Sequence, residues 1–185
     1  MITIFENTPY REDKNLVEAY NSFMQLLPDG AWALFRDADT LFLDSFYGSH
    51  IIECIKRYPQ AKCFTAITNR IGNKHQLHAV YNGDDIGKHR SIAISLKQKY
   101  GTECTKIPSA PYMSGMLFVL NKDAWKQIGG FGKFAKQESL ILGVDNELHR
   151  RLIQHNLPVM LMKGLYIYHW YRGGNIGKDR LKHLL

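Results

Sequence analysis

The sequence predicts a single α/β domain spanning residues 1–185, built on a mixed, mostly parallel sheet with helices on both faces. Its strongest apolar segments are continuous rather than alternating, which is typical of strands covered on both sides. Between them lie stretches whose apolar residues recur every three or four positions, as in amphipathic helices. A chain of 185 residues that is 45% hydrophobic and 12% aromatic can bury one proper core.

The first half begins with an expected strand at Met1–Phe5, followed by a polar loop. A helix is expected to start at Asp13, whose side chain can cap it, and to end before Pro28. The run "AWALF" at Ala31–Phe35 then predicts a buried strand.

A second βαβ-like passage follows. We expect a helix over 46–58 and a strand near Lys62–Thr68. The segment Gly72–Arg90 is polar and weakly periodic, so it is interpreted as a loop or as an insertion beside the site. A helix over Ser91–Tyr100 closes this part.

The last part contains the apolar strand within "SAPYMSGMLFVL", residues 109–120, entered through a turn of small residues. Asn121 should cap a short helix that ends at Gly129 and Gly130. We expect another helix over Asp145–His155 and one or two strands within 158–175, before a glycine-rich, basic tail.

Composition narrows the possible environments and partners. The net charge of +7 favours polyanionic partners, including nucleic acid, an anionic membrane surface or phosphate-rich small substrates. The three cysteines, Cys54, Cys63 and Cys104, lack metal-binding spacing and are expected to be buried thiols. No apolar run approaches the roughly 18 residues of a membrane span, and no signal peptide is evident, so a cytoplasmic location is expected.

Two aspartates follow the buried strand directly, in the stretch "FRDADTLFLD". In an extended segment, side chains at i and i+2 point the same way from positions about 6.5 to 7 Å apart, so Asp37 and Asp39 could bind one divalent cation. Ligands of open α/β sheets bind at the carboxyl ends of strands, which favours this interpretation. The alternative is a solvated turn.

Three further segments could contribute to the same site, and each also has a structural interpretation. The glycines of "SGMLFVLNKDAWKQIGGF" allow close approach to a ligand, or they simply end a helix. Asp145 in "GVDNELHRRL" could be reactive or could cap its helix. His169 in "YIYHWYR" could bind a metal or pack in the core.

In this order, the four segments resemble the family 2 glycosyltransferases and their relatives with the GT-A fold. Those proteins carry a strand-terminal D-x-D, here "DAD", and a glycine-marked strand and helix ending in "GGF". They also carry an "ED" helix with a following arginine, here "VDNELHRRL", and sometimes a late histidine, here in "YHWYR". The matches run from Ala31 to Arg172 and cover about three quarters of the chain.

The resemblance implies an abbreviated GT-A domain that transfers a sugar from a UDP- or GDP-linked donor to a hydroxyl acceptor, with inversion. Asp37, Asp39 and His169 would hold Mn²⁺ or Mg²⁺, and an imidazole ligand favours manganese. Asp145 would be the general base. The implied substrate-binding residues are Asp37, Asp39, Ser114, Gly115 and Arg172.

Two other classes of protein remain open from the sequence. The basic residues suggest a nucleic-acid-binding or phosphodiester-cleaving protein, although they are scattered rather than clustered in one stripe, and stable nucleic-acid binding is not expected. They include Arg150, Arg151, Lys178, Arg180 and Lys182. A catalytically silent, sugar- or nucleotide-binding relative that acts as a scaffold is the third class, because Val144 replaces the glutamate of "ED" and only 36 residues precede Asp37.

Overall fold

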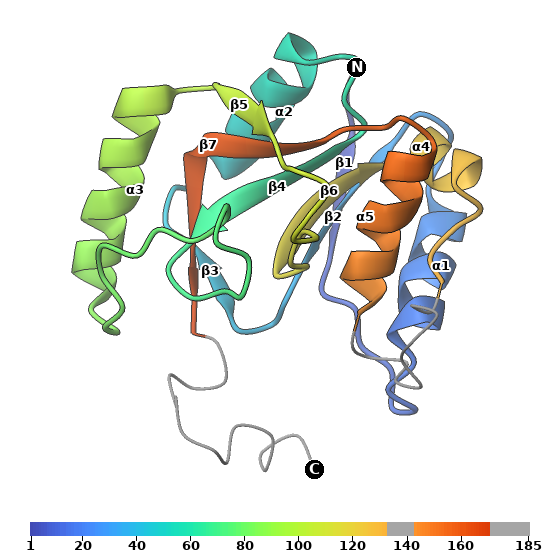
Figure 1. Ribbon diagram of the computed structural model, residues 1–185, viewed down its shortest axis with the longest axis horizontal. Coiled ribbons are helices and arrows are strands. Elements are labelled where there is room, and N and C mark those ends of the chain that lie inside the picture. The colour runs from blue at the N-terminus through green and yellow to red at the C-terminus, as the bar shows by residue number, and fades with distance from the viewer. Residues whose placement is uncertain (133–142, 171–185) are drawn as a thin grey trace.

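The computed structural model describes residues 1–132 and 143–170, which form a seven-stranded sheet with helices on both faces (Figure 1). The strands are β1 (Ile4–Asn7), β2 (Trp32–Arg36), β3 (Thr40–Phe42), β4 (Cys63–Thr68), β5 (Cys104–Lys106), β6 (Leu117–Asn121) and β7 (Val159–His169). The helices are α1 (Leu16–Leu26), α2 (Tyr47–Arg57), α3 (Ile86–Tyr100), α4 (Lys122–Gln127) and α5 (Val144–Gln154). The predicted α/β class and the helices on both faces are confirmed.

The sheet is mixed, but it is not mostly parallel as the sequence led us to expect. The strand order is β1-β2-β6-β4-β7-β3, and β5 pairs with β7. Among the named strands of the described residues, β1 with β2 and β4 with β7 are the parallel pairs, and the other four pairs are antiparallel. The reason is that β6 runs between β2 and β4 in the opposite direction to both, while β3 and β5 run antiparallel to β7.

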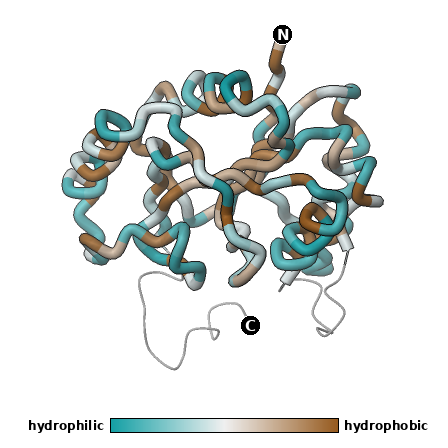
Figure 2. The backbone as a smooth tube through the Cα atoms, turned by 45° about the horizontal axis from the view of Figure 1, so that its top comes forward, coloured by the Kyte–Doolittle hydropathy of each residue, from teal (hydrophilic) through white to brown (hydrophobic). Residues whose placement is uncertain are grey.

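Side chains alternate between two cores along each central strand. In β2, Ala33 and Phe35 belong to the core under α1, α4 and α5, whereas Trp32 and Leu34 belong to the core under α2. Such two-sided burial explains why the strand is apolar at every position. Figure 2 shows this as hydrophobic colour along the central strands and mostly hydrophilic colour on the outer turns of the helices.

β7 bends in its middle, and this bend brings its end to the candidate site. Residues 159–162 pair with β4 and β5, whereas residues 166–169 pair with the end of β4 and with β3. A Cβ atom at Gly164, between these parts, would lie 2.0 Å from the carbonyl oxygen of Gly101, so only glycine fits. The bend allows β3, which starts four residues after β2 ends, to join the far side of the sheet (Figure 1).

Most predicted elements are present, with corrections at their ends. Asn15, not Asp13, caps α1: its side chain accepts a hydrogen bond from the Glu18 amide, while Asp13 pairs with Arg11 in the preceding turn. Helix α3 begins at Ile86, five residues before the expected start, because Asp85 caps it. The last strand is a single bent one.

Other expectations from composition can be compared with the structure directly. All three cysteines are buried and free. Among the described residues, no helix is long and apolar enough to cross a membrane.

Candidate metal and active site

A tight turn at the carboxyl end of β2 presents the two aspartates. The amide and the hydroxyl of Thr40 both donate to the Asp37 carbonyl, at 3.2 and 2.6 Å. The turn is fixed on both sides, because the Asp37 amide donates to the Met116 carbonyl and the Trp170 amide donates to the Asp39 carbonyl. The expectation of an extended D-x-D segment is therefore wrong; a turn, not strand alternation, points both carboxylates the same way.

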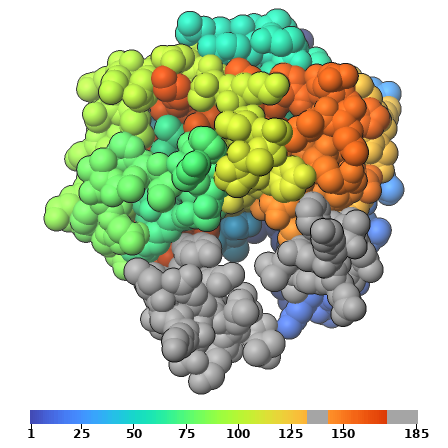
Figure 3. All heavy atoms as spheres, viewed as in Figure 1, coloured from blue at the N-terminus to red at the C-terminus, as the bar shows by residue number. Residues whose placement is uncertain are grey.

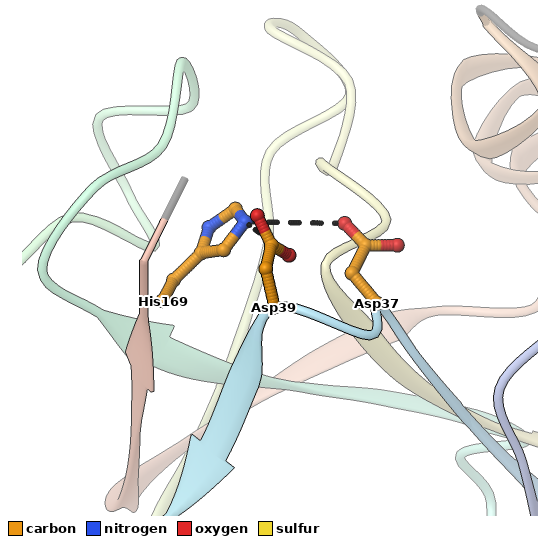
Figure 4. A group of neighbouring side chains, drawn as sticks. All are labelled: Asp37, Asp39 and His169. Carbon is orange, nitrogen blue, oxygen red and sulfur yellow. Dashed lines mark ion pairs between the residues drawn. The ribbon is translucent and has the colours of Figure 1, made fainter. Parts of the chain in front are cut away.

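The end of β7 brings His169 to these carboxylates. Its Nε2 atom lies 3.3 Å from Asp39 Oδ1 and 4.0 Å from Asp37 Oδ2. One ligand atom from each of the three residues lies within 4.8 Å of the other two. In Figure 4 the imidazole and both carboxylates face one another from the ends of β7, β3 and β2. Two carboxylates and an imidazole form a donor set that a divalent cation could occupy.

The residues after β4 hold His169 in one orientation. The Asn69 side chain accepts from the His169 amide at 2.8 Å and donates to the His169 carbonyl at 3.2 Å. His169 Nδ1 lies 2.8 Å from the Arg70 carbonyl, which can only accept, so Nδ1 carries a hydrogen. Nε2 therefore faces the carboxylates, an orientation like that of metal-binding histidines whose other ring nitrogen donates to a backbone carbonyl.

The pKa of Asp37 is raised, which indicates that the surroundings do not fully stabilise its negative charge. The pKa of Asp37 is raised to about 6: burial is the largest cause, the negative charges of Asp39 and Asp145 add to it, and His169 opposes them. Its side chain is 47% exposed, so the carboxylate is open to a ligand from one side although protein surrounds the rest. A cation would relieve the repulsion between these carboxylates.

The three residues open into a cavity of about 400 Å³. Asp145, Ser114 and Gly115 line the same cavity, so the structure brings these predicted residues together with the aspartates and His169. Arg172 lies outside the described residues, as do Lys178, Arg180 and Lys182.

Asp145 is held in the cavity wall by backbone groups. Its Oδ2 accepts from the Gly115 amide at 2.7 Å, and its Oδ1 accepts from the Asn146 amide at 2.9 Å. A Cβ atom at residue 115 would lie 2.8 Å from the Asp145 Cβ, so glycine is required for this approach. Burial raises the pKa of Asp145, while the two amide donors lower it. The result is an ionisable carboxylate made more basic by its surroundings.

Sequence reasoning missed two buried amides that join the cavity walls. Gln76 exchanges hydrogen bonds with the backbone of Ser114, donating at 3.0 Å and accepting at 2.8 Å. Asn73 donates to the Tyr112 carbonyl at 2.7 Å. In Figure 3 the green and yellow surfaces of these two segments lie side by side. The sequence did contain a signal for them: side-chain amides follow the buried strand β4, just as Asp37 follows the buried strand β2.

The "GGF" segment and the arginines of α5 have structural partners. Gly129 and Gly130 have φ values of +75° and +79° at the end of α4. Arg151 donates to the Gly130 carbonyl, and both Arg150 and Arg151 pair with the buried Glu147. These glycines therefore end a helix, and both arginines are occupied by an internal carboxylate.

No protein-family model matches the sequence, and no curated protein matches it. The described residues form a mixed sheet whose strand ends present an Asp-Asp-His cluster beside the partly buried Asp145.

Proposed function

We propose that this protein is a metal-dependent, inverting glycosyltransferase with an abbreviated GT-A domain. The observation that carries the proposal is the convergence of Asp37, Asp39 and His169 in one cavity with Asp145. A metal cluster alone is compatible with many activities. A separate basic carboxylate in the same cavity adds the second group that transfer to a hydroxyl requires.

The donor set fits a divalent cation. Asp37 and Asp39 supply hard oxygen ligands, and His169 supplies a nitrogen that favours Mn²⁺ over Mg²⁺. When bound, the cation would stabilise the negative charge that develops on the departing diphosphate of a UDP- or GDP-linked sugar. The fixed turn and the Asn69 contacts keep the three ligands in place before donor binding.

Asp145 would take the proton from the acceptor hydroxyl. The acceptor oxygen forms a bond to the anomeric carbon, the bond from that carbon to the diphosphate oxygen breaks, and the hydroxyl proton moves to the Asp145 carboxylate. The Gly115 and Asn146 amides hold this carboxylate still, and burial makes it a better proton acceptor. Attack opposite to the leaving group gives inversion.

Val144 limits how the acceptor can be bound. It lines the cavity but is 3% exposed and packs in the core beneath α1, so its side chain offers no hydrogen bond to an acceptor. Acceptor contacts must therefore come from other groups of the cavity wall, among them Ser114.

Donor binding is tested by thermal unfolding with Mn²⁺ and either UDP or GDP. Ligand at about 100 times its Kd adds about 2.7 kcal/mol of stability, which for a chain of this size raises Tm by roughly 5 to 10 °C. We expect Asp39→Asn to abolish this rise. Asp29→Asn is the matched control, because Asp29 lies in the exposed turn before β2, at the opposite end of that strand. No shift with any nucleotide diphosphate and divalent ion contradicts the proposal.

Transfer is tested separately with Asp145→Asn. We expect this variant to keep the Tm rise with Mn²⁺ and nucleotide diphosphate but to lose sugar transfer to acceptor. The supporting pattern is normal donor binding with transfer reduced by a factor of about 10² or more. If the wild-type protein binds the donor but transfers to no acceptor, the silent donor-binding relative is the better description.

A further inference from the structure

A second cavity, of about 690 Å³, lies away from the aspartates, between α3 and the sheet. Its walls are the inner side of α3, strands β5 and β7, and the loop that precedes α3. Figure 1 shows α3 set beside the sheet with β7 next to it, and in Figure 3 red atoms of β7 are visible between the light-green α3 and the β5 segment. The volume falls in the range of small-molecule sites.

The floor of this cavity is apolar. Ile67 of β4 and Leu161 of β7 come from the sheet, and Ile92 and Leu96 come from α3. Helix α3 has few fully buried apolar residues of its own, Ala93 and Leu96, and forms a small core cluster with Tyr166. The helix therefore covers the sheet only partly, and apolar surface remains accessible between them.

The rim is polar and cationic, with no carboxylate among its lining residues. Lys99, Lys163, His75 and His78 contribute nitrogen atoms. Hydroxyl groups come from Ser91, Ser95 and Thr105. Amines and hydroxyls that surround an apolar floor are suited to a ligand with an anionic group and an apolar body.

The two lysines are gathered at one end of the rim by Tyr100. Their ammonium groups lie 5.0 Å (Lys99) and 4.1 Å (Lys163) from the centre of the Tyr100 ring. Glu103 neutralises Lys163 in an ion pair, whereas Lys99 makes no ion pair within the described part of the chain. Lys99 is therefore the charge at this end that an anion could pair with.

We propose that this cavity is a second ligand site that binds a small amphipathic anion, with its phosphate or carboxylate at Lys99 and its apolar part on Ile67 and Leu161. The inference does not depend on the proposed glycosyl transfer. The segment between β4 and α3 contributes to both sites: its residues Ile71 and Gly72 line the aspartate cavity, and His75 and His78 line this one.

Calorimetric titration with octyl phosphate, below its micelle concentration, tests the site. We expect one molecule to bind per chain, and octanoate to compete with it for the same site. Inorganic phosphate and octanol should each bind at least tenfold more weakly, because phosphate lacks the apolar part and octanol lacks the anionic group. Asp39→Asn should bind octyl phosphate as the wild type does, which separates this site from the metal cluster.

Three variants locate the binding. Lys99→Gln should weaken octyl phosphate binding at least tenfold, and Lys56→Gln, the same charge change at an exposed position of α2, should not. Ser95→Phe should fill the cavity from an exposed position of α3 and abolish binding. No binding to the wild type, equal weakening by Lys56→Gln, or full binding to a folded Ser95→Phe variant each overturns the proposal.

Discussion

Asn69 illustrates how a side chain outside the Asp-Asp-His cluster can set the position of a residue within it. Its amide satisfies both backbone groups of His169, while the Arg70 carbonyl fixes the imidazole through Nδ1. Partners of this kind orient a ligand and commonly affect metal affinity by a factor of about 10 to 100. The position of His169 Nε2 thus depends on two residues that follow a different strand.

Asn69→Ala should weaken Mn²⁺ binding about 10- to 100-fold, because His169 loses its backbone contacts. Calorimetric titration with Mn²⁺ measures this affinity. Asn73→Ala is the matched control: Asn73 is also buried and donates to backbone carbonyls, but these belong to Pro111 and Tyr112. Equal losses of affinity in both variants would mean that general destabilisation, not His169 orientation, is responsible.

Asp37 should lower the stability of the metal-free protein at neutral pH and raise it when a metal is bound. Its pKa is raised to about 6, so the native state holds the proton more tightly than the unfolded state, and stability falls as pH rises through about 6. With chelator at pH 7.5, Asp37→Asn should therefore have a higher Tm than the wild type, and at pH 4 this difference should vanish.

Excess Mn²⁺ at pH 7.5 should reverse that order, because only the wild type keeps the full ligand set. These differences in Tm are measured by thermal unfolding of the wild type and Asp37→Asn at pH 4 and 7.5, each with chelator and with excess Mn²⁺. Asp29→Asn should show no gain with chelator, since Lys126 lowers the pKa of Asp29. A lower Tm for Asp37→Asn with chelator at pH 7.5 would contradict the account of this site.

At the scale of elements, Asn121 joins β6 to α4 as the sequence predicts. Its side-chain oxygen accepts from the amides of Asp123 and Ala124, and its nitrogen donates to the carbonyls of Gly30 and Ala31. The residue therefore caps the helix and also attaches it to the turn before β2.

Asn121→Ala should lower the free energy of unfolding by about 1 to 2 kcal/mol, at the upper part of the range for a lost helix cap. Urea unfolding measures the change, and an unchanged m-value would show that the compactness of both states is preserved. Asn15→Ala removes the cap of α1, a side chain that does not also attach its helix to another turn. This variant should therefore lower the free energy of unfolding by less than Asn121→Ala. Equal losses would argue against the additional role of Asn121.

Elements with a strong local pattern were predictable, and elements defined by distant partners were not. The apolar run of β2 and the periodic apolar residues of α1 and α2 identify them without tertiary information. β3 and β5 are three residues long and exist only because β7 offers an edge to each. The direction of β6 depends on the same kind of long-range pairing, which is why the sheet was expected to be mostly parallel.

For the whole molecule, one aromatic cluster connects the site to the core beneath α1. Phe35, two residues before Asp37, is fully buried and contacts Tyr20, Phe118 and Phe131, with ring centres 4.8, 5.2 and 5.9 Å away. Tyr20 also lines the cavity of Asp37, Asp39 and His169. The cluster therefore supports the strand end from which the aspartates project.

Phe35→Ala should lower the free energy of unfolding by about 3 to 5 kcal/mol, since it removes a buried ring and leaves a void. Phe35→Leu should cost less, because it refills part of the space. Chemical unfolding measures both, and a loss below about 1 kcal/mol for Phe35→Ala would contradict the packing described here.

The candidate site was predictable where its residues follow or begin a recognisable element. Asp37 and Asp39 follow β2, Asp145 lies in the first turn of α5, and His169 ends β7. The positions of Asn69 and Gln76 were not recognised, because their roles lie in hydrogen bonds to segments far away along the chain. The turn geometry at Asp37 was missed for the same reason, since contacts to Met116 and Trp170 fix it.

The bend of β7 divides that strand into two parts that pair with different strands. Residues before Gly164 complete the central layers, whereas residues after it carry the imidazole and accompany β3. Shortening the polypeptide to residue 163 would therefore delete His169 and the neighbour of β3 while sparing the pairing of Val159–Met162 with β4. One strand thus contains a core-forming stretch followed directly by a stretch that ends at the candidate site.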